Sequence, residues 1–157
     1  MLTPGQSVGQ IAPDFTLPRD GGGEVTLSSF RPGKVVVYFY PNASTPGCTT
    51  EAQDFSALLD EFAACNTTLI GLSKDSVKRQ DNFRAKAGLS TILASDESGT
   101  TCEDWGVWAE KKLYGKTFMG IVRSTFLIDG AGRIARVWSP VKVAGHADEV
   151  LAAAQAL

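Results

Sequence analysis

The apolar run VVVYFYP at residues 35–41 constrains the fold of this chain more than any other segment. All its residues before Pro41 are β-branched or aromatic, and no charged side chain interrupts them. An uninterrupted run of this kind is typical of a strand that is buried on both faces, as in α/β proteins. We therefore expect residues 35–41 to form a central strand of an α/β sheet.

Helical spacing of apolar residues alternates with further strand-like runs after this segment. In the first helical pattern Glu51 falls away from the apolar side. In the second, Asp75 is the expected N-cap and Gly88 the expected C-cap. The expected elements are a helix over 48–65, a strand over 67–73, a helix over 75–88 and a strand over 91–96.

The two ends of the chain add antiparallel strands to this β-α-β-α-β order. The sequence predicts a hairpin of 15–17 with 24–27, a short helix in 100–108, a long polar loop over 109–120, a hairpin of 122–129 with 133–138, and a helix over 146–157. The fold class is α/β, with a central mixed sheet flanked by helices and an N-terminal β-hairpin.

Composition limits the classes of partner and location. A chain of 157 residues with 43% hydrophobic residues and a net charge of −2 is expected to be one globular domain over residues 1–157. Basic residues do not cluster with aromatic ones, so nucleic acid is not an expected partner. Because the start of the sequence lacks signal-peptide features and no apolar run reaches about 18 residues, we expect a cytoplasmic protein that does not enter a membrane.

The stretch YFYPNASTPGCTTE at residues 38–51 carries a cysteine from the end of the central strand into a helix. Thr45 and Pro46 are a suitable N-cap and first-turn pair, which places Cys48 in the first helical turn. Free backbone N–H groups and the helix dipole favour a thiolate at such a position. The alternative is that Cys48 is a small buried hydrophobic residue, but open α/β sheets place their chemistry at this edge of the sheet.

The cysteines and the histidine, which are the possible metal ligands or redox-active residues, are scattered along the sequence. Cys48, Cys65 and Cys102 form neither a disulfide framework nor a CxxC pair, and no paired ligand spacing for zinc is present. The absence of a CxxC pair excludes a thioredoxin-like disulfide oxidoreductase. His146, the single histidine, is a candidate cap of the last helix rather than a general base.

Two blocks of the sequence resemble a known family. PNASTPGC is similar to the P-x-x-x-T-x-x-C signature of peroxiredoxins, and STPGCTTEAQDF resembles their bacterioferritin comigratory protein, or peroxiredoxin Q, branch. The segment over 110–129 resembles the part of that branch that carries its active-site arginine, and VKVAGHADEVL resembles its C-terminal end. The resemblance implies a thioredoxin-like fold and a thiol-dependent peroxidase for hydrogen peroxide and organic hydroperoxides, without a metal or organic cofactor.

The resemblance also implies a role for each residue of the motif. Cys48 is the implied peroxidatic thiolate, which attacks the peroxide and becomes a sulfenic acid. Thr45 accepts the peroxide proton and orients the sulfur with its own O–H, Arg123 stabilises negative charge, and Pro41 shields the thiolate. If the strand after Arg123 runs antiparallel beside residues 35–41, Arg123 and Cys48 meet at one edge. Glu51 either supports Arg123 or is a solvated helix carboxylate.

The sequence departs from the family where a second cysteine would reduce the sulfenic acid. The two positions at which members of the branch carry a resolving cysteine hold Gln53 and Arg84. Cys65 lies 17 residues after Cys48 along one expected helix, or about 25 Å away, which is too far for a disulfide. Cys102 follows a strand two positions from the central one, so its pairing with Cys48 would need rearrangement.

The leading prediction is therefore a one-cysteine cycle, in which thioredoxin, or glutathione with glutaredoxin, reduces Cys48. The alternatives are a two-cysteine cycle with Cys102 as the resolving residue, and a non-catalytic thioredoxin-fold binding or chaperone module. Because no large apolar stripe is left for an interface, a monomer is expected.

Overall fold

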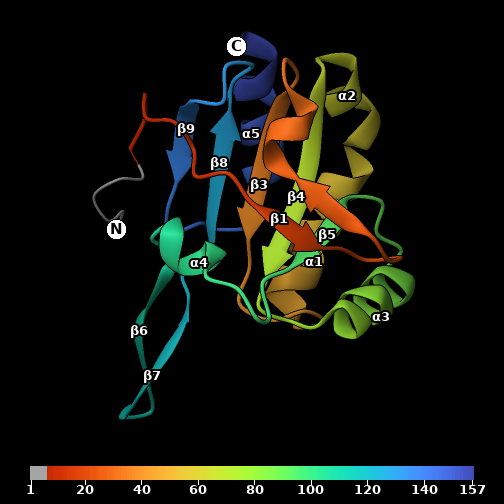
Figure 1. The fold of residues 1–157 in the computed structure, drawn as a ribbon. Helices are drawn as coiled ribbons and strands as arrows, with labels where there is room; N and C mark the ends of the chain where they lie inside the picture. Colours follow the sequence, from red (N-terminus) through yellow and green to blue (C-terminus); the bar gives the residue numbers. More distant parts are fainter. Residues whose placement is uncertain (1–6) are drawn as a thin grey trace.

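A mixed five-stranded sheet forms the centre of the computed structural model, which describes residues 7–157 (Figure 1). The strand order is β5-β4-β3-β8-β9; β3, β4 and β5 are parallel, and β8 and β9 are antiparallel to their neighbours. The expected mixed α/β sheet with a central strand at 35–41 is confirmed. The strands are β3 (Lys34–Phe39), β4 (Thr67–Ser73), β5 (Ile92–Ser95), β8 (Ser124–Ile128) and β9 (Ile134–Trp138).

Alternate side chains of β3 enter two separate cores, one on each face of the sheet. Val36 and Tyr38 pack in the core under the longer helices, whereas Val35 and Val37 pack in the core on the opposite face. The helices on the first face are α1 (Pro46–Ala57), α2 (Leu59–Ala64), α3 (Val77–Ala87) and α5 (His146–Ala156). The second face is covered by β1 (Thr16–Pro18), β2 (Glu24–Thr26), the 3-10 helix η1 (Leu27–Phe30) and α4 (Thr101–Asp104). Burial on both faces explains why β3 is apolar throughout.

Several expected boundaries are confirmed. β1 and β2 pair as the N-terminal antiparallel hairpin. α3 ends at Gly88, which adopts the left-handed conformation (φ 69°) that favours glycine at a helix C-terminus. The short helix at Cys102 and the last helix are present as α4 and α5.

The expected polar loop over 109–120 is wrong. Residues Trp108–Leu113 and Lys116–Ile121 form a separate antiparallel hairpin, β6 and β7, which projects from the body of the molecule (Figure 1). Tyr114 and Gly115 connect the two strands with φ values of 51° and 76°. Positive φ at both central residues is the geometry of a type I′ turn, which matches the twist of a two-residue hairpin.

Two helix boundaries also differ from the expectation. The helix expected over 48–65 is interrupted at Leu58, where α1 ends and α2 begins with a new turn. The N-cap of α3 is Ser76, whose hydroxyl accepts from the Arg79 N–H, and not Asp75. The side chain of Asp75 instead accepts from the Ala43 N–H in the loop after β3.

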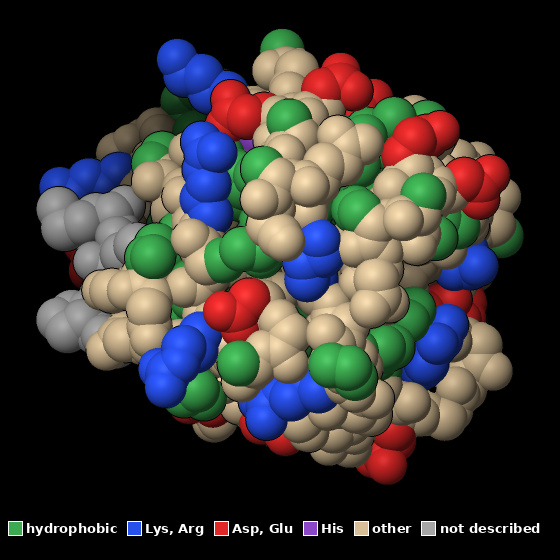
Figure 2. Space-filling model, turned by 90° about the horizontal axis from the view of Figure 1, so that it is seen from above, with side chains coloured by type: hydrophobic (Ala, Val, Ile, Leu, Met, Phe, Trp, Pro, Cys, Tyr) green, Lys and Arg blue, Asp and Glu red, His purple; other side chains and the backbone are tan. Residues whose placement is uncertain are grey.

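The end of the molecule opposite the β6–β7 hairpin carries a mixed surface. Lys, Arg, Asp and Glu side chains alternate over this face, and hydrophobic side chains occur in small groups between them (Figure 2). Among residues 7–157, no helix has the length and the apolar character that crossing a bilayer requires.

Candidate active site

The loop between β3 and α1 carries Cys48 to the edge of the sheet. The Tyr40 N–H donates to the Leu72 carbonyl (3.1 Å), so pairing with β4 continues one residue beyond the end of β3. The chain then turns, and α1 begins at Pro46 with Thr45 in the N-cap position. Cys48 lies in the first turn of α1 with 1% of its surface exposed. Its predicted position at a helix start is confirmed.

Arg123 reaches Cys48 from the neighbouring strand. Phe39 at the end of β3 pairs with Ser124 at the start of β8, so Arg123 is brought to the edge where the loop begins. Its Nη2 donates to Cys48 Sγ at 3.3 Å. Gly47 leaves room for this contact, because a Cβ at that residue would lie 3.3 Å from the same Nη2. The structure thus brings Arg123 and Cys48 together as expected.

Glu51 holds the other side of the Arg123 guanidinium. The Arg123 Nη1 donates to Glu51 Oε1 at 2.7 Å, and Glu51 is only 1% exposed. The alternative of a solvated helix carboxylate is therefore wrong, and Glu51 does not face away from the core. Its second oxygen, Oε2, has no hydrogen-bond partner among the described residues.

Burial and charge act in opposite directions on this ion pair. Burial raises the pKa of Glu51 to about 7, although the Arg123 charge and hydrogen bond oppose the shift. For Arg123, burial lowers the pKa, but the Glu51 carboxylate and Cys48 outweigh it, and the net pKa is raised. Arg123 therefore remains a cation, while Glu51 is able to change its protonation state near neutral pH.

The Thr45 hydroxyl donates its proton to the backbone of its own loop. Its Oγ1 donates to the Asn42 carbonyl at 2.8 Å, and it makes no side-chain cap on α1. The expectation that the Thr45 O–H orients Cys48 is not met in this conformation, because the proton is already engaged. The lone pairs of Oγ1 remain available as acceptors.

Pro41 is half-buried and lies at the edge of a groove of about 610 Å³. The groove runs between the start of α3 and the β6–β7 hairpin, and Arg79, Lys111, Phe118 and Met119 contribute to its walls. The position of Pro41 beside this opening is compatible with the expected shielding of the site from solvent.

Asp75 and Lys111 belong to this region but were not identified from the sequence as site residues. Asp75 Oδ2 accepts from the Ala43 N–H in the loop at 2.7 Å. Since β4 is the parallel neighbour of β3, the residue just after β4 could have been placed beside the loop after β3. Lys111, expected in a loop, lies on β6; its pKa is lowered by burial and by the Arg123 charge, while Cys48 opposes the shift.

Cys102 lies on the opposite face of the sheet from Cys48. Cys102 packs with Trp105 in the core under β1, β2 and α4, whereas Cys48 packs in the core under α1 and α5. Burial and the Asp96 carboxylate raise the pKa of the Cys102 thiol well above its ordinary value.

Cys65 caps the C-terminus of α2 and is half-buried. Its Sγ lies 3.3 Å from the Phe62 carbonyl oxygen and 3.4 Å from Thr67 Oγ1. These contacts are those of a small helix-end residue, as expected.

His146 does not cap α5, because the N-cap is Gly145 and the imidazole is buried. Its Nε2 is 2.8 Å from Thr125 Oγ1, and burial lowers its pKa to about 4. A search of residues 7–157 for three or more His, Cys, Asp or Glu side chains arranged around a possible metal ion finds no such group.

Comparison with known proteins identifies the family. Residues 8–137 match the AhpC/TSA family. The chain belongs to this family. Peroxiredoxin Bcp of Xanthomonas campestris pv. campestris is 49% identical over 91% of this chain and 89% of its own length. The Bacillus subtilis and Escherichia coli proteins of the same name are 44% and 43% identical, over at least 91% of this chain. Within the AhpC/TSA family, the chain is a peroxiredoxin of the bacterioferritin comigratory protein branch.

Solved structures of this branch share the fold. A structure of the Xanthomonas campestris bacterioferritin comigratory protein, from a study of its alkyl peroxide reduction activity, has a TM-score of 0.86 at 48% identity, over 90% of both chains. The Xylella fastidiosa PrxQ structure has a TM-score of 0.91 at 40% identity, over 96% of both chains. The expected thioredoxin-like peroxiredoxin fold is confirmed, and so is the expected membership of an enzyme family.

Proposed function

We propose that this peroxiredoxin reduces hydrogen peroxide and organic hydroperoxides through a sulfenic acid on Cys48, in a one-cysteine cycle that an external thiol completes. The observation that carries the proposal is the Arg123 guanidinium, which lies between the Cys48 sulfur (3.3 Å) and the buried Glu51 carboxylate (2.7 Å). A fixed cation beside a sulfur at a helix N-terminus favours the thiolate, which is the nucleophile.

In the first step the Cys48 thiolate attacks the terminal peroxide oxygen. An S–O bond forms, the O–O bond breaks, the sulfur is oxidised to a sulfenic acid, and the leaving oxygen takes up a proton as water or an alcohol. Arg123 stabilises the negative charge as it moves from sulfur to oxygen. Thr45 accepts the peroxide O–H in its free lone pairs, and Pro41 limits the access of water.

In the second step an external thiol attacks the sulfenic sulfur, which releases water and leaves a mixed disulfide on Cys48. A second thiol then displaces Cys48 and forms a disulfide with the first. This route is supported by the separation of Cys102 from Cys48 across the sheet and by the raised pKa of the Cys102 thiol. Gln53 and Arg84 supply no sulfur at the remaining positions.

Intact-mass analysis after one equivalent of peroxide, without added thiol, tests this cycle. The expected product is a chain that has gained one oxygen on Cys48, and the Cys102→Ser variant should give the same product at the same rate. The Cys48→Ser variant should lose thiol-dependent peroxide consumption. An internal disulfide between Cys48 and Cys102 would contradict the one-cysteine cycle, and unchanged consumption by Cys48→Ser would contradict the enzymatic role of this residue.

We also propose a reductant, a cellular compartment and an oligomeric state for the enzyme. Thioredoxin, or glutathione with glutaredoxin, is the reductant; side-by-side turnover with each system identifies which one serves. Three free cysteines suit a reducing compartment, so we place the protein in the cytoplasm. We propose a single domain that acts as a monomer, which sedimentation analysis of the reduced and oxidised protein tests.

A further inference from the structure

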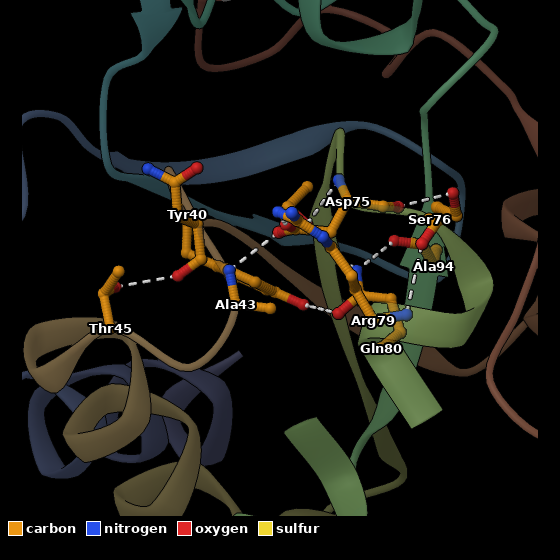
Figure 3. A network of polar contacts seen from close by, with 11 residues as sticks. Tyr40, Ala43, Thr45, Asp75, Ser76, Arg79, Gln80 and Ala94 are labelled. Carbon is orange, nitrogen blue, oxygen red and sulfur yellow. Dashed lines mark hydrogen bonds and ion pairs between the residues drawn. The ribbon is translucent and has the colours of Figure 1, made fainter. Parts of the chain in front are cut away.

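The peptide group between Asn42 and Ala43 makes a hydrogen bond at each of its ends (Figure 3). Its carbonyl accepts from Thr45 Oγ1 at 2.8 Å, and its N–H donates to Asp75 Oδ2 at 2.7 Å. Because a peptide group is a rigid plane, the direction of its N–H fixes the direction of its carbonyl. Asp75 is thus linked to the Thr45 hydroxyl through a single peptide group.

Asp75 is itself held in place from several sides. Its side chain is 5% exposed, and its Oδ2 also accepts from Ser73 Oγ at 2.7 Å. Oδ1 pairs with Arg79 Nη1 at 3.6 Å, and the Asp75 carbonyl accepts from Ser95 Oγ at 2.6 Å. The carboxylate therefore offers the loop an acceptor in a fixed position.

A buried network continues from Asp75 to the start of the same loop (Figure 3). Gln80 Nε2 donates to Ser73 Oγ at 3.0 Å and to the Ala94 carbonyl at 2.9 Å. The Tyr40 hydroxyl donates to Gln80 Oε1 at 2.6 Å. Tyr40, Ser73 and Gln80 are all fully buried. Tyr40 and the peptide group between Asn42 and Ala43 are therefore anchored to the same hydrogen-bonded network.

The loop has little else to hold it. In the described part of the chain, the bond from the Ala43 N–H to Asp75 is the only hydrogen bond that joins residues 41–45 to residues outside the loop and α1. Ser44 has a positive φ of 64°, which is uncommon for a residue with a side chain. The carboxylate of Asp75 is therefore the main polar contact that sets the conformation of this loop.

We propose that Asp75 is a positioning residue for peroxide reduction, which acts by setting the direction of the Thr45 hydroxyl. With its proton on the Asn42 carbonyl, Thr45 Oγ1 directs its lone pairs to an incoming peroxide O–H. A charged acceptor on the N–H also polarises the peptide and strengthens the carbonyl as an acceptor. This inference rests on the role proposed above for Thr45.

If Asp75 acted on Cys48 only through its charge, its removal would change the rate of Cys48 oxidation in the opposite direction. A negative charge near Cys48 disfavours the thiolate, so its removal should raise reactivity if charge alone mattered. A fall in the rate on removal of the Asp75 carboxylate therefore reports the position of the loop and not the field of the charge.

The test is the second-order rate constant for oxidation of Cys48 by hydrogen peroxide. Asp75→Ala should lower it about fivefold to tenfold, as expected for the loss of one hydrogen bond. Asp75→Asn keeps a weaker, neutral acceptor and should lower it only about twofold to threefold. Arg79→Gln is the matched control, because it removes the ion pair from the same carboxylate and leaves the Ala43 bond intact; its rate should equal that of the wild type. The ultraviolet thiolate signal of Cys48 should be the same in all four proteins.

A double-mutant cycle with Thr45→Val decides whether Asp75 acts through Thr45. In the Thr45→Val background, both Asp75 substitutions should change the rate by less than about twofold. The proposal is overturned if Asp75→Ala slows this background by the same factor as the wild type, or if Arg79→Gln slows the enzyme as much as Asp75→Ala. If Asp75→Ala does not fold, the same comparison is made with Asp75→Asn in the wild type and in the Thr45→Val background. A wild-type rate for Thr45→Val alone would remove the proposed role of Thr45, a distinct failure that overturns this inference as well.

Discussion

Replacement of Arg123 by alanine separates the contribution of this residue to stability from its contribution to chemistry. The substitution leaves the Glu51 carboxylate, in a residue that is 1% exposed, without the only hydrogen-bond donor that it has among residues 7–157. A buried carboxylate in that state binds a proton, so its pKa rises above the value of about 7 that it has with Arg123 present. Well below pH 7 the carboxyl is already largely protonated in the wild type, and this part of the loss is small.

Above pH 7 the two proteins should diverge. The wild type loses the Glu51 proton, whereas the Arg123→Ala variant retains it in the folded state. The stability deficit of the variant should therefore grow with pH by up to about 1.4 kcal/mol per pH unit, until the new pKa of Glu51 is reached. Urea unfolding in a Cys48→Ser background measures this slope without a contribution from the Cys48 sulfur. Addition of Glu51→Gln should abolish it.

The rate of Cys48 oxidation in these variants should not change in parallel with their stability. Loss of a charged hydrogen bond to the thiolate is worth about 1.5–3 kcal/mol, or roughly tenfold to 150-fold in the rate of Cys48 oxidation. The Arg123→Ala, Glu51→Gln double variant should be as slow as Arg123→Ala, although its alkaline instability is gone. If the stability deficit of Arg123→Ala does not change with pH above pH 7, the reasoning about Glu51 is refuted. Recovery of the rate in the double variant would refute a direct role of Arg123 at the sulfur.

Further predictions concern buried groups around the site. The pKa of Glu51 is raised from 4.5 to about 7, so its contribution to stability falls as pH rises through that window, and Glu51→Gln should become more stable relative to the wild type over the same range in urea titrations. The pKa of His146 is lowered from 6.5 to about 4, so the wild type should lose stability as pH falls through that window, and His146→Gln should lose less. Cys102 is fully buried with a raised thiol pKa, so an alkylating reagent should label it only at the rate of global unfolding, after the half-buried Cys65; mass analysis of digested samples checks the order.

The central sheet could be predicted because its inner strands β3, β4 and β8 are buried on both faces. An apolar run such as 35–41 has few alternatives, and its neighbour over 67–73 was predicted with the same bounds as β4. The antiparallel strand that follows Arg123 was also predicted in place. That placement alone puts Arg123 at the same edge of the sheet as Cys48.

The β6–β7 hairpin could not be predicted, because its strands are not buried as those of the central sheet are. Most of its residues are exposed or half-exposed on both faces, so the sequence shows no alternation of apolar and polar side chains. Its turn uses Tyr114 at a positive φ, where asparagine or glycine is the usual signal. The break at Leu58 was missed because Leu58, Leu59 and Phe62 continue the helical apolar spacing of α1.

Within the site, tertiary contacts decide what the local sequence leaves open. Asp75 and Ser76 are adjacent, and either residue could cap α3. A helix cap is worth about 1 kcal/mol with either side chain, and the half-buried Ala43 N–H also needs an acceptor. Only the longer carboxylate of Asp75 reaches the Ala43 N–H, at 2.7 Å, and Ser76 caps the helix instead. The direction of the Thr45 hydroxyl depends on the same peptide group, and therefore on a contact between two segments that are distant in sequence, the loop after β3 and the residue after β4.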